Sequence, residues 1–264
     1  MAIQVTWLSH AGFALQIGTH RILIDPFLSG NPPAPAKPTD LDADFILLSH
    51  GHGDHIGDAP AIARRTGATV VANNEIGGWL RAKHRLEHVH GINPGGGVKL
   101  PFGRVELTIA HHSSSLPDGS YGGQPNGILI KTTAGPKIYH AGDTAAFLDM
   151  QLIGDEGIDL ALLPIGGWGP RLSPGHLGPA EAAAAAALSG ARHVIGIHYG
   201  TLYPRGWPTW HLEWMTRPLV DLASQLPVRA PAATLHPLSP GATAHFSSRS
   251  GQLELDVVDQ SGPA

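Results

Sequence analysis

The chain has 264 residues, 42% of them hydrophobic, which is ordinary for a globular protein and excludes a largely disordered chain. Its 21 acidic and 17 basic residues give a formal net charge of -4, and no Lys/Arg run is long enough to indicate a nucleic-acid surface. The sequence has no cysteine, which excludes disulfides and thiolate ligands, so any metal must be held by nitrogen and oxygen.

Short β-rich or continuous apolar runs, separated by glycine and proline, predict strands along most of the chain. In chain order they cover residues 3–8, 13–17, 21–24, 44–49, 69–72, 103–110, 126–132, 137–143, 159–165, 193–200, 243–246 and 253–258. Helices are predicted over residues 59–66, 74–84, 179–189 and 210–226, the last interrupted at Pro218. Helices that follow buried strands, with β-rich segments at both ends, indicate two sheets in the core with helices outside.

No internal repeat or linker divides the sequence, so residues 1–264 are expected to form one domain. The N-terminus lacks a charged segment followed by a continuous apolar stretch, and no run approaches the roughly 20 apolar residues that span a bilayer. We therefore expect a cytoplasmic protein without a signal peptide or membrane span. Its expected partner is a small-molecule substrate rather than nucleic acid, and a homo-oligomer stays open.

The segment LLSHGHGDHIGD has more metal-capable side chains than any other part of this histidine-rich chain. Directly after the buried run FILLS come His50, His52, Asp54 and His55. Gly51 and Gly53 alternate with them, and we expect their missing Cβ atoms to allow unusual backbone angles. Imidazole and carboxylate suit Zn, Mn or Fe(II). The alternative is a polar loop in which Asp54 and Asp58 cap helices, but the density of ligand-type residues favours a metal site.

This segment resembles the His-x-His-x-Asp-His motif of the metallo-β-lactamase superfamily. Other segments follow in the family's order, namely TWLSHAGFAL, ILIDPFLSGNP, AHHSSSLPDG, IYHAGDTAAFLDMQLIG, DLALLPIGG, GPAEAA and IGIHYGT. The resemblance covers roughly residues 3 to 205 and points to a small metal-dependent hydrolase branch related to ascorbate-phosphate lactonase-like proteins. One departure is Ser9 before His10, where that branch usually has glycine. The resemblance implies an α/β fold, the four-layer αββα sandwich.

The resemblance also implies two divalent metal ions, Zn first, with Mn or Fe as alternatives. Carried over by position, the ligands of one metal are His50, His52 and His112, those of the other are Asp54, His55 and His198, and Asp143 bridges both. His112 is preferred to His111 because the branch places the ligand directly before the serines. Asp25 matches a carboxylate that orients a ligand imidazole. Each of these ligands lies at or near the end of a predicted strand, which would give an open-topped site.

Other residues have two interpretations each. His10 would line the active site and donate a hydrogen bond to substrate, or be buried for structural reasons. His140 would support the turn at Asp143 or simply pack, and His176 would contribute to a substrate lid or simply be exposed. The serines at 113–115 would form hydrogen bonds with the metal-binding side chains or with substrate. A group of aromatic residues near the last ligand would wall an apolar pocket or, alternatively, belong to the core and a dimer contact. These residues are Trp168, Tyr199, Tyr203, Trp207, Trp210 and Trp214.

The implied reaction is hydrolysis at a dinuclear metal centre with a bridging hydroxide, because a bound metal lowers the pKa of water from about 16 to about 7. Asp54 would position the water or accept its proton. The lack of cysteine argues against a dedicated β-lactamase, and the lack of a basic surface argues against RNA processing. A lactone or other ester is the preferred substrate. The alternatives are phosphodiester or phospholipase-D-like hydrolysis and a metal-stabilised binding protein without catalysis.

Overall fold

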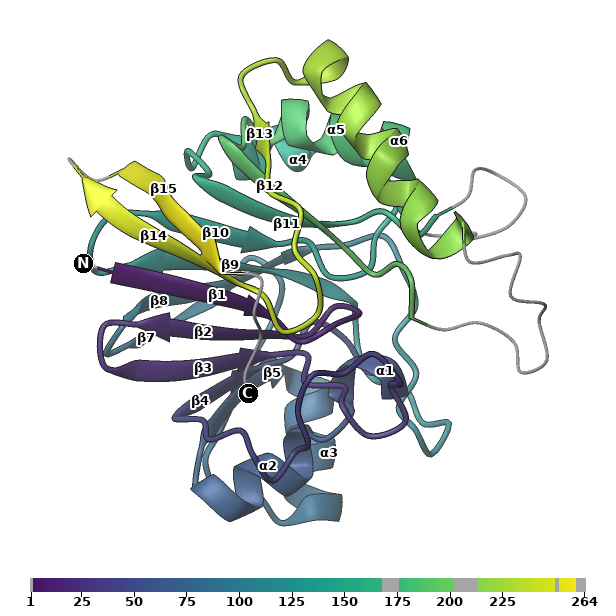
Figure 1. The fold of residues 1–264 in the computed structure, drawn as a ribbon. Coiled ribbons are helices and arrows are strands. Elements are labelled where there is room, and N and C mark those ends of the chain that lie inside the picture. Colours follow the sequence, from purple (N-terminus) through teal and green to yellow (C-terminus); the bar gives the residue numbers. More distant parts are fainter. Residues whose placement is uncertain (1, 168–175, 202–212, 250–251, 260–264) are drawn as a thin grey trace.

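The computed structural model describes residues 2–167, 176–201, 213–249 and 252–259, and it stacks two β-sheets between two layers of helices (Figure 1). Helices α2 (Ala59–Thr66) and α3 (Asn74–His84) cover the outer face of the first sheet. The outer face of the second sheet is covered by α4 (Met150–Gly154), α5 (Pro179–Leu188) and α6 (Glu213–Arg229). The α/β four-layer αββα sandwich expected from the sequence is confirmed.

The first sheet has eight strands in the order β15-β14-β1-β2-β3-β4-β5-β6. Their bounds are β1 Ala2–Trp7, β2 Phe13–Ile17, β3 His20–Ile24, β4 Phe45–Leu47, β5 Thr69–Asn73, β6 Val89–Ile92, β14 Thr243–Arg249 and β15 Gln252–Asp259. Strands β3 to β6 run parallel to one another, while β1, β2, β14 and β15 pair antiparallel.

The second sheet has seven strands in the order β13-β12-β11-β10-β9-β8-β7. Their bounds are β7 Gly97–Leu100, β8 Gly103–Ile109, β9 Asn126–Thr132, β10 Lys137–His140, β11 Leu160–Pro164, β12 His193–Ile197 and β13 Thr234–Leu235. Strands β10 to β13 are parallel, and the β7-β8-β9-β10 part is antiparallel.

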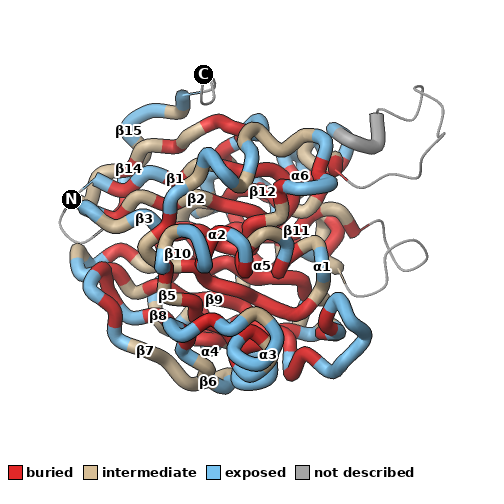
Figure 2. Tube along the Cα trace, turned by 90° about the horizontal axis from the view of Figure 1, so that it is seen from below, coloured by how far each residue is buried: buried red, intermediate tan, exposed pale blue. Residues whose placement is uncertain are grey.

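Burial follows the position of each strand in the two sheets (Figure 2). Strand β1 alternates exposed and buried residues, as expected of a strand with one face in the core, and every residue of β11 is buried. One apolar cluster fills the space between the sheets, and a second lies between the first sheet and helices α2 and α3. The core therefore holds both sheets rigidly behind the loops at their edges.

Helix α6 continues through Pro218 instead of being interrupted there. Proline removes one main-chain donor from a helix, but α6 buries Leu222 and Leu226 in the core between the second sheet and α5, and this packing outweighs the loss. Strands β6, β7 and β13 and the short helices α1 (Gly53–Ile56) and α4 were not predicted, because such short elements have no clear periodicity of their own.

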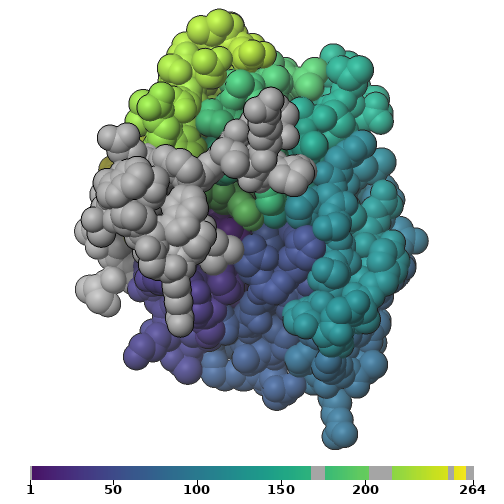
Figure 3. Space-filling view, turned by 90° about the vertical axis from the view of Figure 1, so that its right-hand side faces the viewer, coloured from purple at the N-terminus to yellow at the C-terminus, as the bar shows by residue number. Residues whose placement is uncertain are grey.

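The segments after β4, β8, β10 and β12 converge beside α1, although they come from both sheets. Figure 3 shows this side of the molecule, where the purple-to-blue N-terminal segments lie next to teal segments from the middle of the chain. In the described part of the chain, none of the helices has the length and apolar character needed to cross a bilayer.

Candidate metal centre

The loop after β4 and the single turn of α1 present four ligand-type side chains within six residues. The main-chain N–H groups of His55 and Ile56 both donate to the carbonyl of His52, at 3.0 and 2.9 Å, and these bonds close the α1 turn. Nε2 of His50 lies 2.9 Å from Nδ1 of His52. The loop thus gathers the two histidines that precede α1, and α1 carries Asp54 and His55.

The glycines of this loop have other roles than the unusual backbone angles expected from the sequence. Neither Gly51 nor Gly53 has a positive φ, and a Cβ at Gly53 would meet no atom within 4 Å. Gly51 allows close packing, because a Cβ there would lie 3.1 Å from Oγ of Ser114. The residue that requires glycine is Gly57, with φ 41° and a Cβ position only 2.6 Å from the carbonyl oxygen of Pro26.

Asp25 lies buried behind the loop and orients it. Its carboxylate accepts hydrogen bonds from the main-chain N–H of Ser49 at 2.8 Å and from the Ser49 hydroxyl at 2.5 Å. Nδ1 of His55 lies 2.8 Å from the same carboxylate, which fixes Nε2 of His55 as the nitrogen that faces the site. The arrangement matches the supporting role that the sequence analysis gave to Asp25.

Asp143, in the loop after β10, lies at the centre of the candidate ligands. Its Oδ2 is 3.1 Å from Nε2 of His198 and 3.2 Å from Nε2 of His55. The same oxygen is 3.7 Å from Nε2 of His112 and 3.9 Å from Nε2 of His50. One carboxylate thus faces histidines from both sides of the site.

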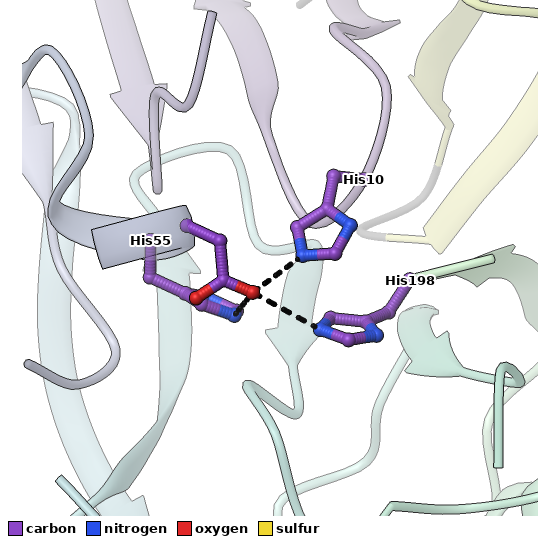
Figure 4. Close-up of side chains that lie close together, drawn as sticks. His10, His55 and His198 are labelled. Atoms are coloured by element: carbon purple, nitrogen blue, oxygen red, sulfur yellow. Dashed lines mark hydrogen bonds and ion pairs between the residues drawn. The ribbon is translucent and has the colours of Figure 1, made fainter. Parts of the chain in front are cut away.

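The candidate ligands form two groups around Asp143. We call His50, His52 and His112 the first half-site, and Asp54, His55 and His198 the second half-site. Within the first half-site the three ligand atoms lie within 4.8 Å of one another, and so do those of the second half-site together with His10. His10, His55 and His198 point toward one another (Figure 4).

The choice between His111 and His112 depends on where the two rings point. The ring of His112 faces Asp143, whereas the ring of His111 stacks on Phe147 with centroids 4.8 Å apart. Ser113 Oγ lies 3.3 Å from Nε2 of His52, so the serine segment contacts the first half-site. Of the two histidines, only His112 therefore lies among the candidate ligands.

His10 lies beside the second half-site, but its side chain is almost completely buried, with 1% of the residue exposed. Its Nε2 is 3.0 Å from Oδ2 of Asp54, and its Nδ1 is 2.6 Å from the hydroxyl of Thr201. Burial and the nearby charge of His198 lower the pKa of His10 to about 4, so the ring is neutral at neutral pH. In this structure both ring nitrogens contact protein partners, Asp54 and Thr201, and the role toward substrate expected from the sequence stays a prediction.

Three buried polar atoms at the centre of the site lack a hydrogen bond of good geometry to the described residues: Oδ1 of Asp143 and Nε2 of both His55 and His198. The two nitrogens lie near Oδ2 of Asp143, at 3.2 and 3.1 Å, as ion pairs. Buried polar atoms in native proteins are nearly always paired, and where they are not, a bound ion can take the place of the partner. These nitrogen and oxygen atoms are ligands that Zn, Mn and Fe(II) accept. The residues present therefore fit a divalent cation between Asp143 and the histidines of the second half-site.

The electrostatics of the site point the same way. Burial alone would raise the pKa of Asp143, but the neighbouring His198 and His55 outweigh burial and hold it well below its ordinary value. Burial would lower the pKa of His55, yet Asp143 and Asp25 raise it well above its ordinary value. Burial and the charge of His55 lower the pKa of His50. The ionised carboxylate of Asp143 thus lies among several imidazoles, an arrangement of negative charge and nitrogen atoms that suits a bound cation.

His176 joins this cluster, whereas the sequence suggested either a place in a substrate lid or simple exposure. Its Nε2 lies 2.9 Å from Oδ2 of Asp143, and its ligand atom is close to that of His112. The signal available in the sequence was its place in a Gly/Pro-rich segment directly before α5, which begins at Pro179. His140 lies behind the site: its Nδ1 accepts a hydrogen bond from Gly142 N–H, and its Nε2 donates to the carbonyl of Ala11.

Of the aromatic residues considered for a pocket, Trp168, Tyr203, Trp207 and Trp210 lie outside the described residues, as does the side chain of Trp214. Tyr199 is buried and stacks on Trp7, with ring centroids 5.3 Å apart. Tyr199 therefore belongs to the core next to His198.

Comparisons with known proteins agree with this architecture. The family described as "Beta-lactamase superfamily domain" matches residues 20–199. A UPF0173 metal-dependent hydrolase of Rubrobacter xylanophilus is 48% identical over 205 residues, which cover 75% of this chain and 82% of that protein. UPF0173 metal-dependent hydrolase TTHA1283 of Thermus thermophilus is 44% identical, over 76% of this chain and 86% of that one.

Among solved structures, Igni18, a metallo hydrolase of the archaeon Ignicoccus hospitalis, is 30% identical with a TM-score of 0.75. The match covers 94% of this chain and 100% of Igni18. The sequence motifs, the fold and the relatives therefore agree on one assignment. The chain belongs to the β-lactamase superfamily and, within it, to the UPF0173 metal-dependent hydrolases.

Proposed function

We propose that the protein hydrolyses a lactone or another neutral ester at a dinuclear metal centre, with Zn as the first candidate metal. The observation that carries this proposal is the convergence of two histidine-rich half-sites on the single carboxylate of Asp143. The first half-site, His50, His52 and His112, would hold one ion. Asp54, His55 and His198 would hold the other, and Asp143 would contact both.

When bound, the two ions would supply a water activated near neutral pH and would polarise the scissile carbonyl. The chain's own residues would then orient the water. Burial alone would raise the pKa of Asp54, but the hydrogen bond from His10 and the nearby His55 outweigh burial and lower it. An ionised Asp54 is suited to accept a hydrogen bond from the water and so to position it.

A neutral substrate is favoured by the surface next to the first half-site. A cavity of about 610 Å³ opens there and is lined by His112 and by residues of the 113–125 segment, among them Ser113, Ser115 and Gln124. No lysine or arginine lines this cavity in the described part of the chain. Hydroxyl and amide groups can bind the oxygen atoms of an ester or lactone, whereas among the described lining residues a phosphodiester would find no cationic side chain and would depend on the metal ions alone to balance its charge.

The test compares a panel of lactones and aryl esters with bis-nitrophenyl phosphate, using Zn-loaded and Mn-loaded protein. We expect turnover of a lactone or ester and two equivalents of metal by elemental analysis. Faster turnover of the phosphodiester would overturn the substrate class, and one equivalent would overturn the dinuclear centre. Thermal stabilisation by metal without turnover of any substrate would indicate a binding protein instead.

The link between metal and turnover is tested by His52→Ala, with His90→Ala as the matched control. His52 belongs to the first half-site, while His90 is an exposed histidine on β6. We expect His52→Ala to lose metal and turnover together and His90→Ala to keep both. Full activity in demetallated protein would show that the reaction does not need the metal.

A further inference from the structure

We infer that His10 is the positioning residue of the second half-site, holding Asp54 through its side chain and His198 through its main chain. This inference rests on the proposed dinuclear function. His10 precedes the metal-binding motif by some forty positions, in the turn between β1 and β2, yet it contacts two candidate ligands that come from different sheets.

The hydrogen bonds of the ring fix its orientation. An ionised carboxylate only accepts hydrogen bonds, so the 3.0 Å contact with Asp54 places a proton on Nε2. On the other side of the ring, Nδ1 and the hydroxyl of Thr201 share a hydrogen bond of 2.6 Å, which holds the ring in this orientation. Because Nε2 has a proton, it has no lone pair to offer a metal, and His10 acts through Asp54 rather than as a ligand.

The oxygen that His10 holds is the one that faces the other ligands. Oδ2 of Asp54 lies 3.9 Å from Nε2 of His198 and 4.0 Å from Nε2 of His55. A carboxylate on a one-turn helix such as α1 could rotate freely about its side-chain bonds. The hydrogen bond from His10 removes that freedom and keeps Oδ2 at the point where the two imidazoles meet.

The main chain of His10 holds His198 from the other side. Its carbonyl accepts hydrogen bonds from the main-chain N–H of His198 at 2.9 Å and from the indole of Trp7 at 3.0 Å. Both histidines have left-handed backbones, with φ 54° at His10 and 57° at His198, and the centroids of their rings lie 3.9 Å apart. Left-handed backbone is rare at residues other than glycine, so the contact is maintained against local strain.

The test measures binding of Co²⁺ to the demetallated full-length protein, from its visible absorption and by equilibrium dialysis. The principal variant is Thr201→Val, which keeps the shape of the side chain but removes the hydroxyl, and Thr201→Ser restores it. His10→Asn is the second variant, because asparagine tolerates a left-handed backbone. His90→Ala serves as the control for a histidine outside the site.

Wild type is expected to bind two equivalents. Thr201→Val and His10→Asn should weaken the second equivalent by about 10–100-fold and change its spectrum, the range typical of residues that hold a ligand in place. The first equivalent should keep its affinity in both variants, and Thr201→Ser should return the second toward wild type.

Three results would overturn the inference. A single equivalent in wild type would refute the dinuclear centre and this inference with it. Two equivalents with wild-type affinity in both variants would refute the role of His10 alone. Equal weakening of both equivalents would show that His10 supports the fold as a whole rather than the second half-site.

Discussion

The two half-sites are held in place in different ways. In the first half-site, none of the three histidines has a positive φ. In and behind the second half-site, His10, Asp25 and His198 all have left-handed backbones, with φ between 43° and 57°. Apart from Ser9, which precedes His10, Arg85 is the one other non-glycine residue with positive φ in the described part of the chain.

The two half-sites therefore differ in how much backbone strain they contain. A left-handed non-glycine residue costs about 1–3 kcal/mol and persists only where the surrounding structure holds it. The second half-site therefore depends on contacts between distant segments, through Asp25, His10 and Asp143. The first half-site depends on the short loop after β4 and on the serine segment that packs against it. Changes behind the two half-sites should consequently affect different metal ions.

The largest effect is expected for Asp143→Asn, because Asp143 faces both half-sites. The substitution keeps the shape of the side chain but removes the negative charge that lies within 4 Å of five histidines. Both metal equivalents should weaken by more than about 100-fold, the upper end of what residues behind the ligands produce, and turnover should be lost. Metal content after dialysis checks this. Loss of only one equivalent would contradict the shared role of Asp143.

A smaller and one-sided effect is expected for Asp25→Asn. Asn keeps one carbonyl acceptor and tolerates the left-handed backbone of Asp25, but it gives His55 a neutral partner in place of a carboxylate. The second metal equivalent should weaken by about 10–100-fold, and the first should change less. Separate dissociation constants from a Co²⁺ titration check the difference. Because Ser49 contacts both Asp25 and His50, equal weakening would show that the two half-sites are not independent.

The third prediction compares Gly53, the first residue of α1, with Gly57, which directly follows α1. Gly57→Ala combines a left-handed backbone with a contact of 2.6 Å to the carbonyl of Pro26, so it should destabilise the protein by about 2–4 kcal/mol. Gly53→Ala meets no atom within 4 Å and should be neutral or stabilise by up to about 1 kcal/mol. Urea unfolding of the metal-free variants measures both. Equal effects would show that the close approach of α1 to Pro26 is not needed.

How much of the site could be predicted from the sequence depends on how far apart its residues lie in the chain. The first half-site and its neighbours were accessible because His50, His52, Asp54 and His55 lie within six positions, and the family resemblance then pointed to the more distant residues. The left-handed turns were not accessible, because histidine and aspartate have no local preference strong enough to indicate them. Contacts such as that of His176 with Asp143 arise only when loops from separate strands meet. Tertiary packing decides these features.

The smallest effect is expected for Ser114→Ala in the first half-site. The buried hydroxyl of Ser114 accepts a hydrogen bond from Gly51 N–H at 2.9 Å and donates to the carbonyl of Gly122 at 2.9 Å. Its removal leaves the Gly51 donor unpaired, which should cost about 1–3 kcal/mol of stability. The loop itself stays closed by its own bonds, so the first metal equivalent should weaken by less than about 10-fold and the second should not change.

Ser115→Ala is the matched control, because Ser115 is its exposed neighbour in the same segment. Thermal unfolding and a Co²⁺ titration of both variants measure the two parts of this prediction. If Ser114→Ala instead weakened the second equivalent, the serine segment would belong to the network around Asp143. The two half-sites would then share one network of contacts, and changes behind them could not affect the two metal ions separately.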